Sequence, residues 1–367
     1  MKLFLLLTLV SFLCEAKFSK PELMARFMYS GAWNAPDNLW CFSGEPAVLN
    51  DKIFLNCLDH QGSLMAQWKD GNFETIARAE VDQVFSKPIN SFHKMNWYEF
   101  NEFKAIRSYM VSDLVQKIDI SNLGPMDVAK DSFLPLTVDS FFFRLKSEGP
   151  ELLIWKNDKV SPFFRPGSAF LFSPQVGPMG EIALKARDLN FDENSPDRIW
   201  HYSGNWQVVL EDQSANPLSP WKSFRNQISV EGNRVLVIAS DGIQDSLILI
   251  EGPKMEIIAR TGKDLAKFDF FGPKMKNGVI ILRGEDFQGR KAIYVKDETS
   301  FRKLLCQGDI VKTDLGDGVV DYENQDAIFY GAPSLDENGS VYLQATLVGA
   351  ERSKTLLGVG LIKLTHE

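Results

Sequence analysis

Apolar and polar residues alternate along this chain in short runs, and each run follows a turn that contains glycine, asparagine or proline. The clearest runs lie at residues 53–55, 141–143, 182–184, 235–237, 279–281 and 341–343. Alternation with a period of two predicts β-strands that bury one face. A second strand that ends in a polar turn and then a third strand follow, as at 68–73 and 75–78. Asp-Gly and Gly-Asn pairs in these turns are hairpin signals because both residue types tolerate positive φ.

Helical periodicity is nearly absent from the chain. Residues 99–120 admit a helix, but they also fit two strands, 103–109 and 114–120, in register with the other runs. We therefore expect an all-β protein, and a helix at 99–120 is the alternative.

A turn with glycine and proline recurs ahead of four of the strands, at a spacing of about 40–50 residues. The two residues lie at 331 and 333, at 272 and 273, at 177 and 178, and at 44 and 46. Short strands in units of this length predict a β-propeller. First strands that begin near residues 53, 103, 141, 182, 235, 279 and 341 predict seven blades. Six blades are the alternative because the second unit is poorly formed.

The last unit is split between the two ends of the chain. Residues 341–347 and 355–364 supply its first and second strands. Residues 22–26 resemble 256–260, a third strand elsewhere, and residues 39–49 supply a fourth. Pairing of the two ends removes an open sheet edge, which otherwise invites aggregation. We expect a single propeller domain over residues 17–367, closed by two strands from each end.

These repeats resemble those of secreted bacterial β-propeller repeat proteins. The shared positions are Pro333, Leu335, Asn338, Gly339 and Val341, and the Ile258-Ala259 step that Gly262 closes. The resemblance covers nearly all of residues 17–367 and implies the fold. It implies no single activity, because such families include binding, scaffolding and hydrolytic members. The sialidase Asp-box, the WD dipeptide and the kelch glycine pair are not visible in the sequence.

Residues 1–16 have the layout of a secretory signal peptide. Lys2 precedes an apolar core at 3–13, and residues 14–16 form a small-x-Ala cleavage site. The core is too short to span a bilayer. We therefore expect an exported protein that begins at Lys17, in the periplasm or outside the cell, without a transmembrane segment. Cys14 raises a lipoprotein alternative, against which stands Leu13, where a lipobox has a small residue. A buried N-terminal element is a further alternative.

Three cysteines remain in residues 17–367. Cys41 and Cys57 lie on adjacent predicted strands, and in one interpretation they pair in an oxidising compartment. In the other, these two and Cys306 are small buried hydrophobes. An odd number leaves at least one thiol free or paired between chains, so the oligomeric state stays open.

The formal net charge is −8. An acidic protein is a poor general binder of nucleic acid, so we expect no nucleic-acid partner. Motifs of nucleophilic, zinc-dependent and nucleotide-dependent enzymes are missing, including Gly-x-Ser-x-Gly, His-Glu-x-x-His, Cys-x-x-Cys and the P-loop. The histidines, at 60, 93, 201 and 366, share no metal-ligand spacing.

Two acidic stretches have oxygen ligands of the kind that Ca²⁺ prefers. The first begins like an EF-hand loop, but it lacks the glycine of the sharp turn and the final bidentate glutamate. The candidate ligands of the two stretches are Asp188, Asn190, Asp192, Asp317 and Asp321. The alternative is an ordinary solvated acidic loop in each case, so we expect no cofactor and keep Ca²⁺ open.

Aromatic and polar residues mix in four segments ahead of predicted first strands, at 92–98, 221–226, 268–271 and 321–324. If the repeats are equivalent, these segments converge on one face or on the channel mouth. Aromatic rings supply flat contact area and polar groups fix orientation, which suits glycan or peptide binding. The candidate ligand-binding residues are His93, Lys94, Asn96, Trp97, Trp221, Lys222, Arg225, Asn226, Tyr322 and Asn324. The alternative is that the aromatic residues pack between blades.

We expect an exported, non-catalytic binding or scaffolding propeller that recognises a protein, a peptide or a glycan through a loop face. The alternative is a hydrolase or lyase, either glycan-directed or a calcium-dependent esterase or lactonase. It would use channel carboxylates such as Asp269, Asp321 or Glu323. The recurring arginines at 26, 78 and 260 are expected to form ion pairs across blades.

Overall fold

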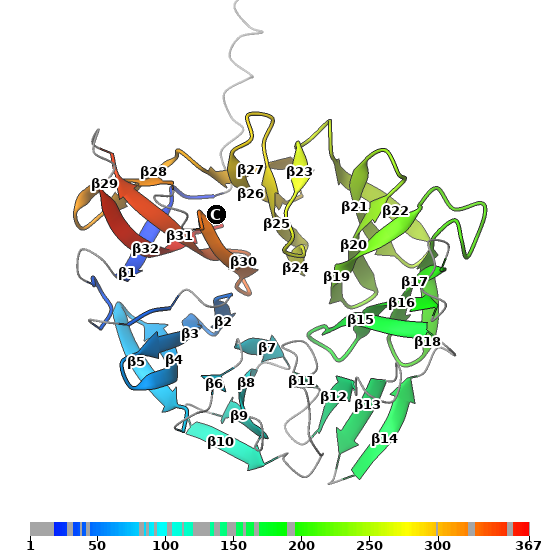
Figure 1. Ribbon diagram of the computed structural model, residues 1–367, viewed down its shortest axis with the longest axis horizontal. Helices are drawn as coiled ribbons and strands as arrows, with labels where there is room; N and C mark the ends of the chain where they lie inside the picture. The colour runs from blue at the N-terminus through cyan, green and yellow to red at the C-terminus, as the bar shows by residue number, and fades with distance from the viewer. Residues whose placement is uncertain are drawn as a thin grey trace, which may run out of the picture.

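The computed structural model describes residues 18–366 apart from 28–31, 37–38, 42–44, 81–83, 86–87, 92–93, 101–104, 112–113, 120–132, 136–139, 145–151, 157–158, 165–168, 189–194, 299, 322–326 and 351–354. Every regular element among the described residues is a β-strand, as expected. The strands form seven separate sheets, which Figure 1 shows around a common centre.

Six sheets follow one another along the chain. The strands of the first three are β2 (Ala47–Leu49), β3 (Lys52–Asp59), β4 (Gly62–Lys69), β5 (Asn72–Arg78); β6 (Val84–Phe85), β7 (Ile89–Ser91), β8 (Lys94–Phe100), β9 (Ala105–Val111), β10 (Leu114–Asp119); and β11 (Phe133–Pro135), β12 (Ser140–Arg144), β13 (Leu152–Lys156), β14 (Lys159–Phe164). The strands of the next three are β15 (Ala169–Val176), β16 (Ile182–Asp188), β17 (Asp197–Tyr202), β18 (Trp206–Glu211); β19 (Ser223–Glu231), β20 (Arg234–Ser240), β21 (Asp245–Glu251), β22 (Lys254–Arg260); and β23 (Lys267–Phe268), β24 (Lys274–Lys276), β25 (Val279–Glu285), β26 (Lys291–Lys296), β27 (Phe301–Cys306).

The seventh sheet, which we call the closing sheet, combines the two ends of the chain. Its strands, in sheet order, are β29 (Gly316–Val320), β28 (Ile310–Thr313), β1 (Glu22–Phe27), β32 (Leu356–Leu364), β31 (Val341–Gly349) and β30 (Phe329–Leu335). Because β29 also pairs with β31, five of these strands close into a ring of their own. The pairing of β1 with β32 confirms that the two ends of the chain meet in one sheet.

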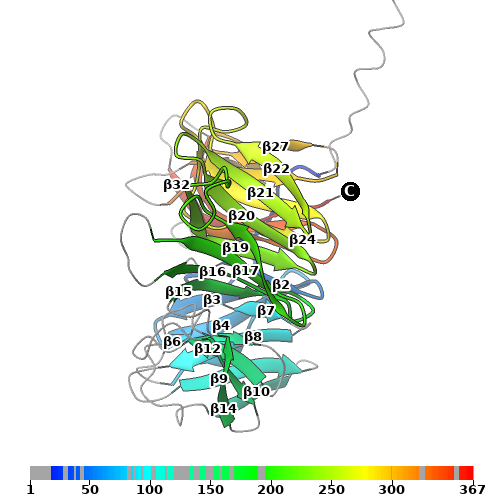
Figure 2. The same cartoon turned by 90° about the vertical axis from the view of Figure 1, so that its right-hand side faces the viewer.

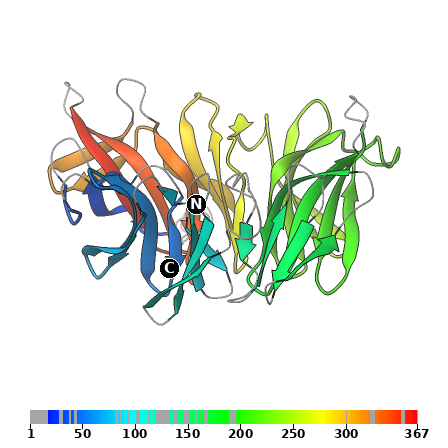
Figure 3. The ribbon, with the colours of Figure 1, turned by 60° about the horizontal axis from the view of Figure 1, so that its bottom comes forward.

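Each of the other sheets runs outward from an innermost strand, and neighbouring strands are antiparallel. Figure 1 shows β2, β24 and β30 on the inner side of the ring. We call the side that carries the connections between second and third strands, and between a fourth strand and the next sheet, the upper face. The connections between first and second strands lie on the opposite, lower face. Figures 2 and 3 show the stacked sheets from two other directions.

The core lies between neighbouring sheets. Phe27 and Val359 of the closing sheet pack with Ile53 and Leu55 of β3. Ala183 of β16 likewise belongs to the apolar cluster of the β19–β22 sheet. Strands buried on both faces need apolar residues at consecutive positions, which explains the apolar runs of second strands such as β20 and β25.

A polar side chain on the second strand of a sheet interrupts this apolar run and reaches the next sheet. Each donates a hydrogen bond to a backbone carbonyl near the upper end of the next innermost strand. The pairs, donor first, are Asn56 and Phe85 (2.8 Å), Lys185 and Phe224 (2.7 Å), Arg283 and Phe329 (3.0 Å), and Gln344 and Cys41. We call these contacts the sheet-to-sheet bonds.

Two details of the predicted strand assignment are wrong. The runs taken as first strands are the second strands of their sheets, because a short innermost strand precedes each one. In the second unit that run is β8, which begins at Lys94, and residues 105–111 form the third strand, β9. The innermost strands escape detection because prolines and register shifts interrupt their alternation, as between Tyr330 and Ser334 of β30.

The expected closure by two strands from each end is also wrong. The C-terminal part supplies β30, β31 and β32, and the N-terminal part supplies only β1 to this side of the sheet. Residues 47–49 form β2, the innermost strand of the following sheet. Three plus one strands therefore close the ring, because β30 already fills the inner position.

The recurring arginines stay within their own sheets, which corrects the expectation of ion pairs across blades. Arg26 of β1 pairs with Asp314 at 2.7 Å, and Arg78 of β5 pairs with Asp59 at 2.7 Å. The Arg260 Nε atom has no hydrogen-bond partner among the described residues.

Of the two interpretations of the cysteines, pairing holds for two of them. Cys41 and Cys57 form a disulfide, and Cys306 is a buried free cysteine.

Candidate binding face

Aspartates that follow the second strand of a sheet close the turns on the upper face. The Asp59 carboxylate accepts the Gln61 N–H at 2.8 Å. The Asp241 carboxylate accepts the N–H groups of Ile243 and Gln244 at 2.8 and 2.9 Å. A carboxylate that satisfies backbone donors two or three residues ahead holds the turn in one conformation. These turns are therefore ordered before any ligand binds.

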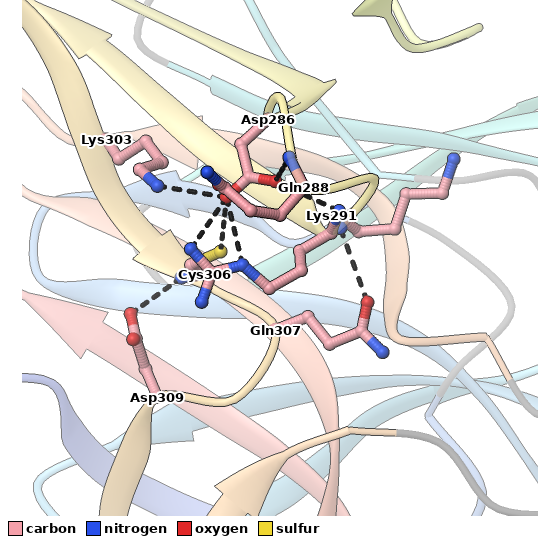
Figure 4. A network of polar contacts seen from close by, with 8 residues as sticks. Asp286, Gln288, Lys291, Lys303, Cys306, Gln307 and Asp309 are labelled. Carbon is pink, nitrogen blue, oxygen red and sulfur yellow. Dashed lines mark hydrogen bonds and ion pairs between the residues drawn. The ribbon is translucent and has the colours of Figure 1, made fainter. Parts of the chain in front are cut away.

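Asp286 closes the matching turn of the β23–β27 sheet and is the hub of the network in Figure 4. It accepts the backbone N–H groups of Gln288 and Arg290 and forms ion pairs with the Arg290 and Lys303 side chains at 2.7 and 3.0 Å. Burial by itself raises the pKa of Asp286, but the hydrogen bonds from Arg290 and Lys303 outweigh it and hold the pKa below its ordinary value.

A thiol lies inside the same network. The Cys306 Sγ atom is 3.7 Å from Asp286 Oδ2 (Figure 4). Burial raises the pKa of the Cys306 thiol. A thiol that stays protonated is a poor nucleophile, and the hydrogen bonds of this network fix the turn that Asp286 closes.

Among the described residues, three connections of the upper face in the β19–β22 and β23–β27 sheets each expose one large apolar side chain, and we call these three side chains the apolar set. Leu218, in the connection that leads to β19, is 93% exposed, and Ile243, in the Asp241 turn, is 95% exposed. Phe287, in the Asp286 turn, is 58% exposed. All three side chains of the apolar set lie in connections between strands, and the strands of their own sheets do not cover them.

The connection that carries Leu218 is held by hydrogen bonds along its length. Asp212 accepts the Ala215 N–H at 2.9 Å, and Asn216 accepts the Leu218 N–H at 3.1 Å. The Ser219 hydroxyl donates to the Glu211 carbonyl at 2.6 Å. Burial raises the pKa of Asp212.

Lys222 is exposed next to Ile243. A Cβ atom on Gly242 would lie 2.6 Å from Lys222 Cδ, so the lysine chain packs closely against this turn. Lys222 was predicted as a ligand-binding residue, and the structure places it on the upper face beside the apolar set.

Nearer the centre, two arginines join the innermost strands of neighbouring sheets. Arg225 donates to the Asp269 carbonyl at 2.6 Å and pairs with Asp245 at 2.8 Å. Arg283 pairs with the Asp269 carboxylate at 3.0 Å and also donates to the Phe329 carbonyl. Burial lowers the pKa of Arg283, although Asp269 acts in the opposite direction. These contacts fix the segment between β23 and β24.

The fixed segment presents one exposed aromatic ring. The Arg283 guanidinium lies 4.3 Å from the centre of the Phe271 ring, and Phe270 meets Phe271 edge-on at 6.0 Å. Phe270 itself is 76% exposed. Among the described aromatic residues of the four predicted segments, Phe270 is thus the exposed one.

The two tryptophans predicted to bind ligand do not reach a surface. Trp97 is completely buried and packs against Phe85, and Trp221 belongs to the core between the β15–β18 and β19–β22 sheets. Asn96 is also buried. The prediction for Trp97 and Trp221 is corrected because their rings fill space between sheets, which was the stated alternative.

The remaining predicted binding residues have structural contacts or lie outside the described residues. Asn226 accepts a hydrogen bond from Lys185 at 3.1 Å. His93, Tyr322 and Asn324, and the side chain of Lys94, lie outside the described residues.

The predicted calcium ligands are not brought together in the described part of the chain, where no group of three His, Cys, Asp or Glu side chains is placed to hold a metal ion. Asp188 ends β16, Asp317 pairs with Lys312, and Asp321 accepts a hydrogen bond from Gln307 at 2.9 Å. Asn190 and Asp192 lie outside the described residues, as does Glu323 of the hydrolase alternative.

Sequence reasoning missed all three members of the apolar set. The available signal was a single large apolar residue inside an otherwise polar turn, as in Asp241-Gly242-Ile243-Gln244. That signal is weak because isolated exposed hydrophobics are common on protein surfaces.

No family model and no curated protein matches this chain. Solved structures do match it. The β-propeller domain of the Trilobed protease from Pyrococcus furiosus is 11% identical and matches with a TM-score of 0.52, over 86% of this chain and 94% of that one. The acylaminoacyl peptidase of Pyrococcus horikoshii is 12% identical, with a TM-score of 0.54, over 88% of this chain and 51% of that one. A prolyl endopeptidase is 10% identical, with a TM-score of 0.52, over 91% and 51%.

This chain therefore spans about half the length of the two peptidases. Likeness at such low identity shows the fold alone, and the fold is that of the β-propellers. The Trilobed protease propeller is described with an open velcro topology, whereas here β1 pairs with β32. In the described residues no helix is long and apolar enough to cross a membrane.

Proposed function

We propose that this chain is an exported, non-catalytic propeller of seven blades that binds a polypeptide partner through the upper face of its β19–β22 and β23–β27 sheets. The observation that carries the proposal is the apolar set, because its side chains project from turns that aspartates already hold in one conformation. A surface that is ordered before binding loses little conformational entropy when a partner covers it.

The chemistry of the apolar set favours a polypeptide over a glycan. Leu218 and Ile243 are aliphatic, and aliphatic side chains gain most by burial against other apolar groups. Phe270 is an exposed aromatic residue of the same sheets, and aromatic residues are the type that a glycan would favour. The test therefore includes glycans.

Charge favours an acidic partner. Lys222, Lys263 and Lys267 are exposed in or next to the connections that flank β19 and β23, in a protein whose formal net charge is −8. Exposed lysines on an otherwise acidic protein attract a negatively charged segment of a partner.

The other parts of the proposal have separate support. Seven sheets among the described residues support seven blades. The layout of residues 1–16 and the Cys41–Cys57 disulfide support export, because disulfides persist in oxidising compartments. Asp269 supports binding over hydrolysis, because its carboxylate is held by Arg283.

The test selects random displayed peptides on immobilised residues 17–367, in parallel with a glycan array. We expect peptides that combine acidic and large apolar residues, with affinity that falls as salt rises. The variants Leu218→Asp and Ile243→Asp should each weaken the selected peptides at least about tenfold, as expected for central contacts of an interface.

Met255→Asp is the matched control. Met255 is 48% exposed in β22, next to a connection on the lower face, and its replacement should leave binding unchanged. Peptide binding that tolerates both upper-face variants would refute the proposed face. Glycan binding without peptide selection would refute the polypeptide partner and direct attention to Phe270.

A further inference from the structure

Near the upper face, the innermost strands repeat one side-chain pairing: a bulky residue lies opposite a small residue of the second strand. The pairs are Leu171 and Ala186, Phe224 and Ala239, Phe268 and Gly284, and Phe329 and Ala345. The four bulky side chains are buried. The small partner leaves room for the bulky one, so each pair anchors the upper end of an innermost strand by burying apolar area.

In the β2–β5 sheet, two cysteines occupy this place. Cys57 directly follows the donor Asn56 along β3, as Ala345 follows the donor Gln344 along β31. An antiparallel bridge between the neighbouring residues 40 and 58 sets Cys41 opposite Cys57. The disulfide therefore stands where four other sheets have a bulky residue and a small one. The β6–β10 and β11–β14 sheets differ, with Phe85 opposite Glu99 and Phe133 opposite Phe143.

The same place receives the sheet-to-sheet bonds. The Phe224 and Phe329 carbonyls accept hydrogen bonds from side chains of the preceding sheets. The Cys41 carbonyl accepts one from Gln344 of the closing sheet. We call this junction, between β31 of the closing sheet and the segment that carries Cys41, the seam. A cysteine side chain buries less apolar area than a phenylalanine. The bond to Cys57 therefore takes the anchoring part that a buried ring plays at the acceptors Phe224 and Phe329.

We propose that the Cys41–Cys57 disulfide is a redox-controlled lock on the seam where the propeller closes. When the lock forms, the two thiols give up two protons and two electrons to the disulfide of an oxidant, which becomes a dithiol, and the Sγ–Sγ bond forms through a mixed disulfide. Cys306 belongs to another sheet, where it ends β27 and its Sγ atom contacts Asp286. Reduction releases Cys41 and loosens the contact between the last sheet and the first.

The test compares four forms of residues 17–367: the oxidised wild type, the wild type with a reductant, C41A/C57A, and C41F/C57A. The last installs the bulky and small pair of the four other sheets. Reduction and C41A/C57A should each lower the Tm by about 4 °C, the value for a loop of about 15 residues in a chain of this size. They should also raise amide hydrogen exchange in β1, β2, β3, β31 and β32, while β19–β22 stays protected.

C41F/C57A should recover both the Tm and the protection, and it should no longer respond to the reductant. Cys306→Ala is the control, and it should respond to the reductant as the wild type does. If C41F/C57A behaves like C41A/C57A, the equivalence of the two pairs is wrong. If reduction of the folded wild type changes exchange in every sheet alike, or in none, the lock is not at the seam.

Discussion

At the scale of single residues, the aspartates at the upper ends of the second strands decide the shape of the candidate binding face. Asp59, Asp241 and Asp286 each satisfy backbone donors of the turn that follows. Two of them also pair with a cation from the fourth strand, Arg78 or Lys303. A charge-assisted hydrogen bond of this kind is stronger than a neutral one. One carboxylate therefore holds the turn in one conformation and also connects it to the fourth strand of the sheet.

The variant Asp59→Asn should lower the free energy of unfolding by about 1–2 kcal/mol at pH 7, because it removes a hydrogen-bonded ion pair. The hydrogen bond from Arg78 lowers the pKa of Asp59 from 3.8 to about 2. Since the folded pKa is the lower one, the stabilisation is complete above pH 4 and is lost as the pH falls towards 2. Urea unfolding at pH 7 and pH 2.5 should show the difference between wild type and variant shrinking at the lower pH.

Asp70→Asn is the matched control for that measurement. Asp70 is an exposed turn residue with a φ of 50°, a conformation that asparagine also adopts. An Asp59 variant that costs no more than the Asp70 variant would show that the ion pair contributes nothing to the turn.

At the scale of elements, polar side chains on the second strands connect sheets that apolar packing alone would leave free to slide. Lys185 of β16 is one of the two charged examples, with Arg283. The Lys185 side chain is 3% exposed, and its ammonium group lies 2.9 Å from the Asp197 carboxylate and also donates to the Phe224 carbonyl of β19. Burial lowers the pKa of Lys185, while Asp197 acts in the opposite direction. A buried charge is tolerated here because Asp197, the Phe224 carbonyl and Asn226 all contact it.

Lys185→Met should therefore lower the free energy of unfolding by about 3 kcal/mol, because it leaves Asp197 buried with less compensation. Exchange of the amides in β16 and β19 should rise more than that of amides in the β2–β5 sheet. Lys254→Met, at an exposed lysine of β22, is the control and should change little. Equal stabilities of the two variants would contradict the role given to the sheet-to-sheet bonds.

At the scale of the whole molecule, closure depends on a short N-terminal strand. β1 lies between β32 and β28, and its Arg26 is buried in an ion pair with Asp314. A propeller without this strand would expose the edge of β32, and an unpaired edge is a template for association. The closing sheet thus controls both the stability and the solubility of the ring.

A protein that starts at residue 28 should associate or lose its cooperative unfolding transition, because β32 has lost its neighbour. Size-exclusion chromatography with light scattering and a thermal scan would measure both effects. A protein that starts at residue 21 keeps β1 intact and serves as the control. A monomeric form without β1, with an unchanged Tm, would show that the strand is dispensable for closure.

The residues by themselves determined the all-β class, the repeat spacing and the meeting of the two chain ends, because alternation and turn chemistry are local properties. The 257–260 run is β-strand in the sequence pattern and in the fold, and the pairing of residues 22–26 with the C-terminal part follows from the same repeat. The innermost strands could not be predicted from the sequence, because prolines and register shifts interrupt their alternation of apolar and polar residues.

Only the tertiary structure decided which side chains are covered. Trp97 and Leu218 are both large and apolar, yet one lies in the core and the other is 93% exposed. Burial depends on the neighbouring sheet, which lies far away in the sequence, so no local pattern separates the two. The place of Cys41 at the seam has the same origin, because its partners Cys57 and Gln344 belong to different sheets. The sequence by itself thus determined the repeated strand, and the packing of one sheet against the next decided the candidate face and the lock.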